Sequence, residues 1–405
     1  MEGLRGVLLR GCGAWRGQVR WRGARPSAAR AALSSEPSTG DSSAAKGALR
    51  YCEVRTSQAA FPEGLAGRRQ GPLARPRVGN SIEMVVRPHA AKIVSALAAF
   101  TTDGANIGTQ RAFLMTGERG VGKSWQLNHI VDHARRAGWV VLFFPEARSL
   151  LHKGVYCQPS PHLAGLFDVP NQAMTMLRAL KAAHEAQLAE IPLQDKEVLG
   201  RYEGAKSVLD VVKAGLQDED EAGTALWDAQ LELLETVAAK VLLAVDEYDQ
   251  LFQPSSWHCD GNKLEAPDLT TAARLLPSGA EAQSRATAWA GGAAEEGGSG
   301  CLPAPPRNGL VVCATTGRYP RVTRVSKKKW PAFEERFEGS SLDPVAERVS
   351  AYSAEEFEAC LELYKKAGTD SAGLVESETE VLRVKAKSGL VPLKVYSKFF
   401  ESIPV

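Results

Sequence analysis

Short runs of mostly apolar residues recur along the chain, each about as long as one strand. They lie at residues 111–116, 139–144, 241–245 and 309–314. Unbroken apolar runs of this kind are typical of strands that are buried on both faces of a parallel sheet. Stretches with helical periodicity lie between them. The pattern therefore predicts an α/β fold, a three-layer domain with a parallel sheet, over residues 81–352.

Four stretches show apolar residues at helical spacing. A helix that begins near residue 123 is expected to bury Leu127, Ile130, Val131 and Ala134. Helical patterns also cover residues 82–100, with Arg87-Pro88 interrupting the start, and residues 171–215, after an irregular loop at 150–170. A further helix, residues 224–239, is expected to turn one face inward, made of Trp227, Leu231, Leu234 and Ala238.

The C-terminal part of the sequence reads as one more strand followed by a helical lid or tail, residues 353–405. The strand is predicted within residues 345–352. Ser353 and Glu356 then have the spacing of a capping box that opens a helix. That helix is expected to bury one face, made of Phe357, Cys360, Leu361 and Tyr364. Two more helical stretches are predicted at about 376–388 and 392–402.

The N-terminus differs from the rest in composition. Between Glu2 and Glu36 there are arginines but no acidic residue and no lysine. An Arg-rich, Ser/Ala-bearing, acid-poor leader is typical of an organelle transit peptide, here residues 1–35, with the mitochondrion favoured over the plastid. A nucleic-acid-binding arm is the alternative, and a secretory signal is disfavoured because no apolar core is present. Residues 36–80 are predicted to be a disordered or extended arm.

Two other segments interrupt the α/β pattern. Residues 253–306 are dominated by Ala, Gly, Ser and Pro and predict a long insertion with a disordered tip. Residues 326–330 combine three lysines with a tryptophan. Such a cluster is usually a solvated loop, and contact with RNA phosphates is the sharper hypothesis.

Composition limits the function classes. The 405 residues carry a net charge of +2, so bulk charge does not indicate a nucleic-acid binder. The seven cysteines include no C-x-x-C pair, which argues against a zinc site and a disulfide framework. No apolar run approaches the length of a membrane span, so no membrane-spanning helix is expected.

The strongest motif follows the first apolar run. Residues 117–124 have the form G-x-x-x-x-G-K-[ST], with Gly117, Gly122, Lys123 and Ser124 at the defining positions. Glycines let successive N–H groups face one anion, Lys123 would reach the outer phosphates, and Ser124 would hold Mg²⁺. The residues predicted to bind a nucleotide here are Gly117, Glu118, Arg119, Gly120, Val121, Gly122, Lys123, Ser124 and Trp125.

A second phosphate-site signature ends the third apolar run. Asp246 would stand at the carboxyl end of this strand, where its carboxylate can reach Mg²⁺ directly or through water. Glu247 could orient or deprotonate an attacking water, which makes it the candidate catalytic base of a slow NTPase. Binding without turnover is the alternative, because a P-loop protein can hold nucleotide and never hydrolyse it.

The fourth apolar run ends in two threonines. Thr315 and Thr316 could sense the γ-phosphate, or they could simply end a strand. Together with the acid pair, this polar strand end resembles the P-loop class of AAA+ and related signalling (STAND-like) ATPases. In that class the strand with the threonines would lie between the P-loop strand and the Asp-Glu strand. No N-K-x-D guanine-reading motif follows the P-loop, so the sequence leaves the base open.

A closer resemblance rests on four segments in order. They are Glu83-Met-Val-Val-Arg-Pro88, Gly117–Ser124, Val241–Asp246 and Val349–Cys360. With these, residues 82–405 resemble the death-associated protein three family of mitochondrial small-subunit ribosomal proteins. The last segment is the most family-specific. The family's P-loop residues carry over to Gly117, Gly122, Lys123 and Ser124, and its strand-end acid to Asp246.

The resemblance implies a component of the mitoribosomal small-subunit head, in the mitochondrial matrix, contacting the small-subunit rRNA and neighbouring mitoribosomal proteins. It also implies GTP or GDP with Mg²⁺, with ATP as the alternative. In animal relatives a glycine follows the acid, whereas this chain has Glu247. Three hypotheses therefore stay open: a ribosomal protein with a structural nucleotide, an active organellar NTPase acting as a switch or assembly factor, and a scaffold with an empty P-loop.

Overall fold

A parallel sheet forms the centre of the protein, and its strand order is β11-β3-β10-β7-β4. The strands are β3 (Ala112–Thr116), β4 (Val140–Phe144), β7 (Val241–Val245), β10 (Gly309–Ala314) and β11 (Ala346–Arg348). All neighbours run parallel. Every residue of β4, β7 and β10 is buried, as the unbroken apolar runs predict. The predicted strands and the predicted place of the threonine strand, between β3 and β7, are confirmed.

The computed structural model describes residues 50–67, 80–100, 110–276, 302–317, 346–366, 377–392 and 394–395. The predictions for the leader at 1–35, the insertion tip, the basic cluster at 326–330 and the end of the last helix lie outside these residues. Within them, no helix has the length and apolar character needed to cross a membrane.

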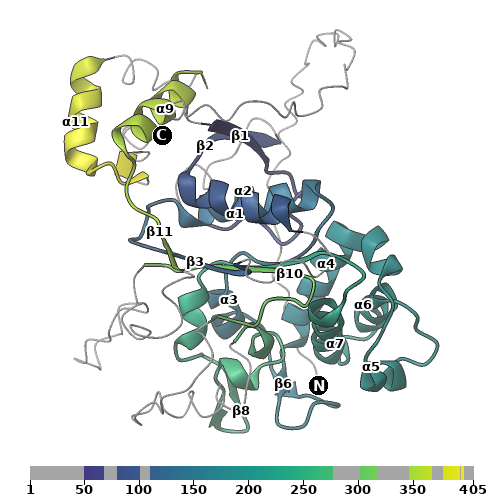
Figure 1. Ribbon diagram of the computed structural model, residues 1–405. Coiled ribbons are helices and arrows are strands. Elements are labelled where there is room, and N and C mark those ends of the chain that lie inside the picture. The colour runs from purple at the N-terminus through teal and green to yellow at the C-terminus, as the bar shows by residue number, and fades with distance from the viewer. Residues whose placement is uncertain are drawn as a thin grey trace, which may run out of the picture. The chain divides into compact units, whose positions relative to one another are not determined.

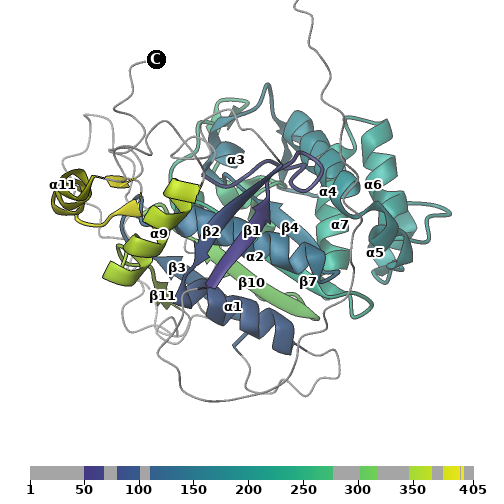
Figure 2. The same ribbon diagram turned by 90° about the horizontal axis from the view of Figure 1, so that it is seen from above.

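Helices cover both faces of the sheet (Figures 1 and 2). One face carries α1 (Pro88–Ala99), α2 (Lys123–Arg136) and the β1–β2 pair (Arg50–Arg55 with Ser81–Val86). The other carries α3 (Arg148–His152), α4 (Pro170–Glu190), α5 (Lys196–Arg201), α6 (Val208–Gln217) and α7 (Ala222–Glu235). Two apolar clusters fill the interfaces, and the strand side chains alternate between them. This is the predicted three-layer α/β domain.

The helix predicted from residue 82 is wrong in its first part. Residues 81–86 form β2, and the helix begins only at Pro88. Proline disfavours helical dihedrals in the preceding residue, and Arg87 is indeed extended, with φ −91° and ψ 153°. The partner strand β1 lies inside the predicted arm at 36–80. The loop after it buries Phe61 and Ala66 against the sheet, so the described part of that arm packs on the domain.

The face predicted for the helix at 224–239 is confirmed only in part: Leu231 and Leu234 pack against the main core, whereas Ala238 lies beyond the helix and is exposed. The helix α7 ends at Glu235, and its fully buried side includes Ala225, Ala229 and Leu233. The predicted residue Trp227 is only half-buried, and the Arg274 guanidinium lies 3.7 Å from its ring centre. Some side chains on the buried face of α7 are polar, so the apolar pattern in the sequence does not follow that face. One example is Glu232, whose carboxylate accepts the N–H groups of Gln194 and Asp195.

Both irregular stretches contain more structure than their composition suggests. The loop at 150–170 includes the end of α3 and the short pair β5–β6 (Gln158–Pro159 with Phe167–Asp168). The first part of the insertion follows the 3-10 helix η2 (Tyr248–Phe252) and contains β8 (His258–Cys259), β9 (Asn262–Lys263), η3 (Ala266–Asp268) and η4 (Ala273–Leu275). Leu264, Leu269 and Leu275 from this part are buried in the main core.

The C-terminal region contains α9 (Ala354–Lys366) and α11 (Glu378–Ser388). The capping box is confirmed, because the Glu356 N–H donates to Ser353 Oγ at 3.1 Å and the Ser353 N–H donates to Glu356 Oε2 at 3.0 Å. Phe357 and Leu361 of α9 pack with Val384 of α11, and Cys360 packs against Val85 of β2. The predicted face of α9 is therefore divided: Cys360 packs on β2, whereas Phe357 and Leu361 pack on α11.

Candidate functional site

The predicted phosphate loop connects β3 to α2 and takes backbone conformations that require glycine. The φ angles of Gly117, Gly120 and Gly122 are +122°, +87° and +100°. Side chains rarely tolerate this region, which glycine adopts freely. At Gly117 space is also limiting, because an added Cβ would lie 2.2 Å from the carbonyl oxygen of Val349. The glycines of the motif are thus needed for the shape of the loop itself.

Lys123 lies inside the loop rather than in solvent. Its side chain is buried, and Nζ donates to the carbonyl oxygens of Gly117 at 2.7 Å and Glu118 at 2.8 Å. The helix α2 begins here, with no acidic residue in its first turn and no side-chain cap at Gly122. A helix start of this kind, with an ammonium beside it, favours a bound anion such as a phosphate. The side chain of Trp125 packs on the core, so this residue would contribute only its backbone.

Asp246 stands at the end of β7, beside the loop. Its carboxyl is 2% exposed, and burial raises its pKa to about 7. The neighbouring Glu247 also raises this pKa, whereas a hydrogen bond from Ser124 and the charge of Lys123 lower it. The structure thus brings together the predicted hydroxyl and carboxylate. Oxygen ligands of this kind, completed by phosphate oxygens and water, suit Mg²⁺, so the residues present fit the predicted ion.

Glu247 has a conformation that is unusual for its residue type. Its φ of 57° and ψ of 34° lie in the left-handed region, where a side chain costs about 1–2 kcal/mol relative to ordinary helical geometry. Its Oε2 is buried and has no hydrogen-bond partner among the described residues. Burial, with Glu146 and Asp249 nearby, raises its pKa to about 7. Glycine adopts this conformation freely, so a glutamate here carries a cost that glycine would not.

The two threonines at the end of β10 differ in role. Thr315 is buried, and its N–H at 3.0 Å and its hydroxyl at 3.5 Å both donate to the Met115 carbonyl of β3. Thr316 is bound to Asp249: its N–H lies 2.7 Å from Oδ1 and its hydroxyl 2.5 Å from Oδ2. A third polar group, the Gln250 amide, reaches both. Thr316 thus presents both its N–H and its hydroxyl to Asp249.

The sequence analysis did not identify the role of Asp249. It is the last acid of Asp246-Glu-Tyr-Asp249, and nothing in the spacing distinguishes it from a solvated residue. In the structure it is 2% exposed, and burial raises its pKa while the hydrogen bonds from Thr316 lower it. Gly317, which follows, would place a Cβ 2.2 Å from the Gly117 carbonyl oxygen. The end of β10 is therefore packed directly on the phosphate loop.

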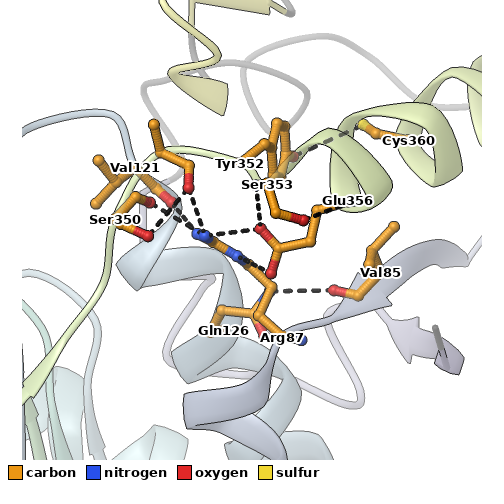
Figure 3. Close-up of polar contacts among 10 residues, drawn as sticks. Val85, Arg87, Val121, Gln126, Ser350, Tyr352, Ser353, Glu356 and Cys360 are labelled. Carbon is orange, nitrogen blue, oxygen red and sulfur yellow. Dashed lines mark hydrogen bonds and ion pairs between the residues drawn. The ribbon is translucent and has the colours of Figure 1, made fainter. Parts of the chain in front are cut away.

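A buried arginine, also missed, joins the loop to the C-terminal region (Figure 3). The Arg87 guanidinium donates to the Val121 carbonyl at 2.8 Å and to both oxygens of Glu356, at 3.1 and 3.0 Å. It also donates to the carbonyls of Ser350 and Ala351, each at 3.1 Å. All of these groups are acceptors, so one cation satisfies the loop, the segment after β11 and the start of α9 together.

The C-terminal segment reaches the loop by a second route. The Tyr352 N–H donates to the Leu390 carbonyl at 2.9 Å, and the Pro392 side chain lies 4.0 Å from where a Cβ on Gly122 would stand. The helical region predicted as a lid or tail therefore touches the phosphate loop from the side of α9 and α11. Arg87 and these contacts make the loop dependent on residues far away in the sequence.

Comparison with known proteins gives consistent matches. Residues 84–385 match the family model described as Mitochondrial ribosomal death-associated protein 3. A stretch of 162 residues, 38% of this chain, is 29% identical to the Small ribosomal subunit protein mS29 of Mus musculus and covers 41% of it. A stretch of 146 residues, 35% of this chain, is 27% identical to the protein of the same name from Bos taurus and covers 37% of it. The chain thus spans about two fifths of these curated relatives.

Proposed function

Since this chain belongs to the mitochondrial ribosomal death-associated protein 3 family, we propose that it is a component of the small subunit of the mitochondrial ribosome that holds a purine nucleotide and Mg²⁺ in its phosphate loop. The relatives named as small ribosomal subunit proteins support the first part. On this proposal the protein lies in the mitochondrial matrix, as part of the small-subunit head. There it would contact rRNA and neighbouring ribosomal proteins.

One observation carries the nucleotide part of the proposal. Ser124 and Lys123 at the start of α2 converge on the buried carboxyl of Asp246, although β10 separates the strands that deliver them. Burial raises the pKa of this acid, and the hydrogen bond from Ser124 and the charge of Lys123 offset that effect only in part. A Mg²⁺ ion with phosphates would compensate the charge of the Asp246 carboxylate, since metal ions are often the largest local charges in such sites.

The nucleotide would act mainly as part of the fold. A ligand that binds only the folded state stabilises it by RT ln(1 + [L]/Kd), about 4 kcal/mol at a thousandfold excess over Kd. We propose GTP or GDP as the occupant, with ATP as the alternative, in keeping with the family resemblance. The bound phosphates would displace the Lys123 ammonium from the loop carbonyls that it contacts at 2.7 and 2.8 Å.

The test is the nucleotide content and ribosome association of the full chain. Protein purified from cells is denatured, and the released nucleotide is separated and quantified. We expect close to one nucleotide per chain in the wild type and loss of at least about tenfold in Lys123→Ala, because the ammonium that pairs with the phosphates is gone. Lys181→Ala is the matched control, since this partly exposed lysine lies on α4, where it forms an ion pair with Glu185 of the same helix at 3.6 Å.

Two results would contradict this proposal separately. A wild-type protein without nucleotide would refute nucleotide binding. A chain that sediments apart from mitochondrial small subunits, whatever its nucleotide content, would refute the ribosomal assignment.

The geometry of Glu247 favours a second candidate function, slow hydrolysis by a switch or assembly factor. Its Oε2 has no hydrogen-bond partner in the part of the chain that the structure describes, and its pKa is raised to about 7. Both are features of a group that can take a proton from water near neutral pH. On this hypothesis Glu247→Gln should keep the bound nucleotide but reduce multiple-turnover hydrolysis by about a hundredfold or more. A wild type that shows no turnover, or a variant that hydrolyses equally fast, would leave the structural role as the better account.

A further inference from the structure

Two cysteines from distant parts of the chain meet where the insertion begins. Cys157 lies just before β5, and Cys259 is the last residue of β8. Both are partly exposed and carry free thiols. The Cys157 thiol donates to the His258 carbonyl at 3.4 Å and also hydrogen-bonds with the Cys259 side chain. The two thiols are therefore neighbours in the folded chain, although their spacing in the sequence gives no sign of it.

A buried tryptophan joins the two segments that carry these cysteines. The indole N–H of Trp257 donates to the Leu150 carbonyl at 2.9 Å. The preceding Ser256 N–H donates to the Leu151 carbonyl, also at 2.9 Å. The Trp257 ring fills the space beside Gly154, where an added Cβ would lie 2.3 Å from it. These contacts lie a few residues before the cysteine on each segment, so they fix which residues of the two segments meet.

The backbone of Cys259 is held by a tight hairpin. Cys259 pairs with Asn262 across the strands β8 and β9, and only Asp260 and Gly261 lie between them. The φ angles of these two turn residues are 50° and 80°. A two-residue turn with both φ angles positive is the type I′ geometry that hairpins favour. Cys259 therefore has little freedom to move away from its neighbour.

The other cysteines in the described part of the chain lack this combination of contact and access. Cys313 and Cys360 are buried. The Cys52 sulfur lies 3.2 Å from His129 Nδ1, and burial raises the pKa of this thiol to about 12. A thiol with so high a pKa holds its proton at neutral pH and is a poor nucleophile. The pair at the start of the insertion is thus the one that small reagents can reach and link among these residues.

We propose that Cys157 and Cys259 form a reversible intramolecular disulfide, with a small disulfide of the glutathione type as the oxidant. One protein thiol loses its proton and attacks a sulfur of the oxidant, which breaks the small disulfide and releases one small thiol with that proton. The second protein thiol then attacks the protein sulfur of the mixed disulfide, and its proton leaves with the second small thiol. Two protein thiols are oxidised, and one small disulfide is reduced to two thiols.

This disulfide would close a long loop that contains α4, α5, α6, α7 and β7. Closing such a loop reduces the conformational entropy of the unfolded chain, so the disulfide and the folded state should stabilise each other. Burial raises the pKa of Cys157, which slows its attack without changing the equilibrium. The pair shares no residue with the phosphate loop, so the proposal stands independently of nucleotide binding and of the ribosomal assignment.

The test uses the full chain, reduced and then brought to equilibrium with glutathione and glutathione disulfide at a series of ratios. The samples are quenched with acid, digested and mapped by mass spectrometry. We expect a peptide that links Cys157 to Cys259 and disappears on reduction. The equilibrium constant for its formation should be at least about a hundredfold higher in the folded chain than in a chain unfolded by urea, because the fold holds the two thiols together.

Thermal unfolding and single variants give a second comparison. The oxidised wild type should unfold about 3 °C or more above the reduced wild type, whereas Cys157→Ser and Cys259→Ser should show no such shift on oxidation. Cys313→Ala, at a buried cysteine of β10, is the matched control and should form the disulfide as the wild type does.

The peptide map of the unaltered chain decides the proposal even where a variant does not fold. A map without the linked peptide, one that links either cysteine to a different partner, or persistent glutathione adducts in its place would overturn the proposal. Equal equilibrium constants in the folded and the urea-unfolded chain would do so as well.

Discussion

Replacing Arg87 with alanine is expected to destabilise the protein by about 3–5 kcal/mol, because it removes one partner of a buried ion pair. The guanidinium and the Glu356 carboxylate are 4% and 8% exposed, so water cannot replace the lost contacts. The variant leaves Glu356 buried without its cation and also leaves the Val121, Ser350 and Ala351 carbonyls without their donor. The free energy of unfolding in urea measures the loss.

The control for Arg87 is an exposed arginine with the same kind of partner. Arg383 pairs with Glu380 at 3.2 Å on the surface of α11, and Arg383→Ala should change stability by less than about 0.5 kcal/mol. Arg87→Lys should recover little, because an ammonium cannot reproduce the forked contacts of the guanidinium. The double replacement Arg87→Leu with Glu356→Leu removes both charges and should be more stable than Arg87→Ala alone. An Arg87→Ala protein as stable as the control would refute the role assigned to this residue.

Arg87→Ala should also weaken nucleotide binding by the phosphate loop. Arg87 holds the Val121 carbonyl at 2.8 Å, two residues before Lys123. Without that hydrogen bond the backbone of the loop is held less firmly. We therefore expect weaker nucleotide retention in Arg87→Ala than in Arg383→Ala. The comparison is made on folded protein without urea, at a temperature where both variants give the native circular dichroism spectrum.

Asp246→Asn is expected to have two opposite effects: greater stability of the nucleotide-free protein and loss of Mg²⁺-dependent nucleotide binding. Burial raises the pKa of Asp246 from 3.8 to about 7, so the folded state holds a proton that the unfolded state releases. Between about pH 4 and pH 7 the folded state therefore binds more protons, and stability falls as the pH rises through this window. Asparagine is neutral at every pH, so at pH 8 the variant should be more stable by up to about 4 kcal/mol, since each unit of the raised pKa corresponds to about 1.4 kcal/mol.

The measurement is urea unfolding at pH 5 and pH 8 in the absence of nucleotide and Mg²⁺. The wild type should lose stability relative to Asp246→Asn as the pH rises, and nucleotide with Mg²⁺ should stabilise only the wild type. Asp210→Asn supplies a control of opposite sign. Hydrogen bonds from the Lys206 N–H and from Ser207 lower the pKa of that carboxyl, so its removal should destabilise at pH 8. A less stable Asp246→Asn protein at pH 8 would contradict the buried-acid interpretation.

Much of the architecture could be predicted because its causes are local. Continuous apolar runs such as 140–144 and 241–245 can be buried only between two layers, and they became adjacent strands. The capping box at Ser353 and Glu356 depends on two residues three positions apart. The phosphate loop was predictable for the same reason: its glycines, lysine and serine act within one turn of chain. Where long-range pairing decided the outcome, the local pattern failed: it was wrong at residues 82–86 and only partly right for the face of α7.

By itself, the sequence determined the α/β layers, the strand and helix identities that rest on periodicity, and the positions of Lys123, Ser124 and Asp246. Only the tertiary structure decided which distant residues meet. Arg87 and Glu356 are 269 residues apart, and Asp249 and Thr316 are 67 apart, yet each pair is in contact. The burial that raises the pKa of Asp246 comes from several elements at once. Such properties depend on which surfaces pack together, and no local pattern of side chains encodes that.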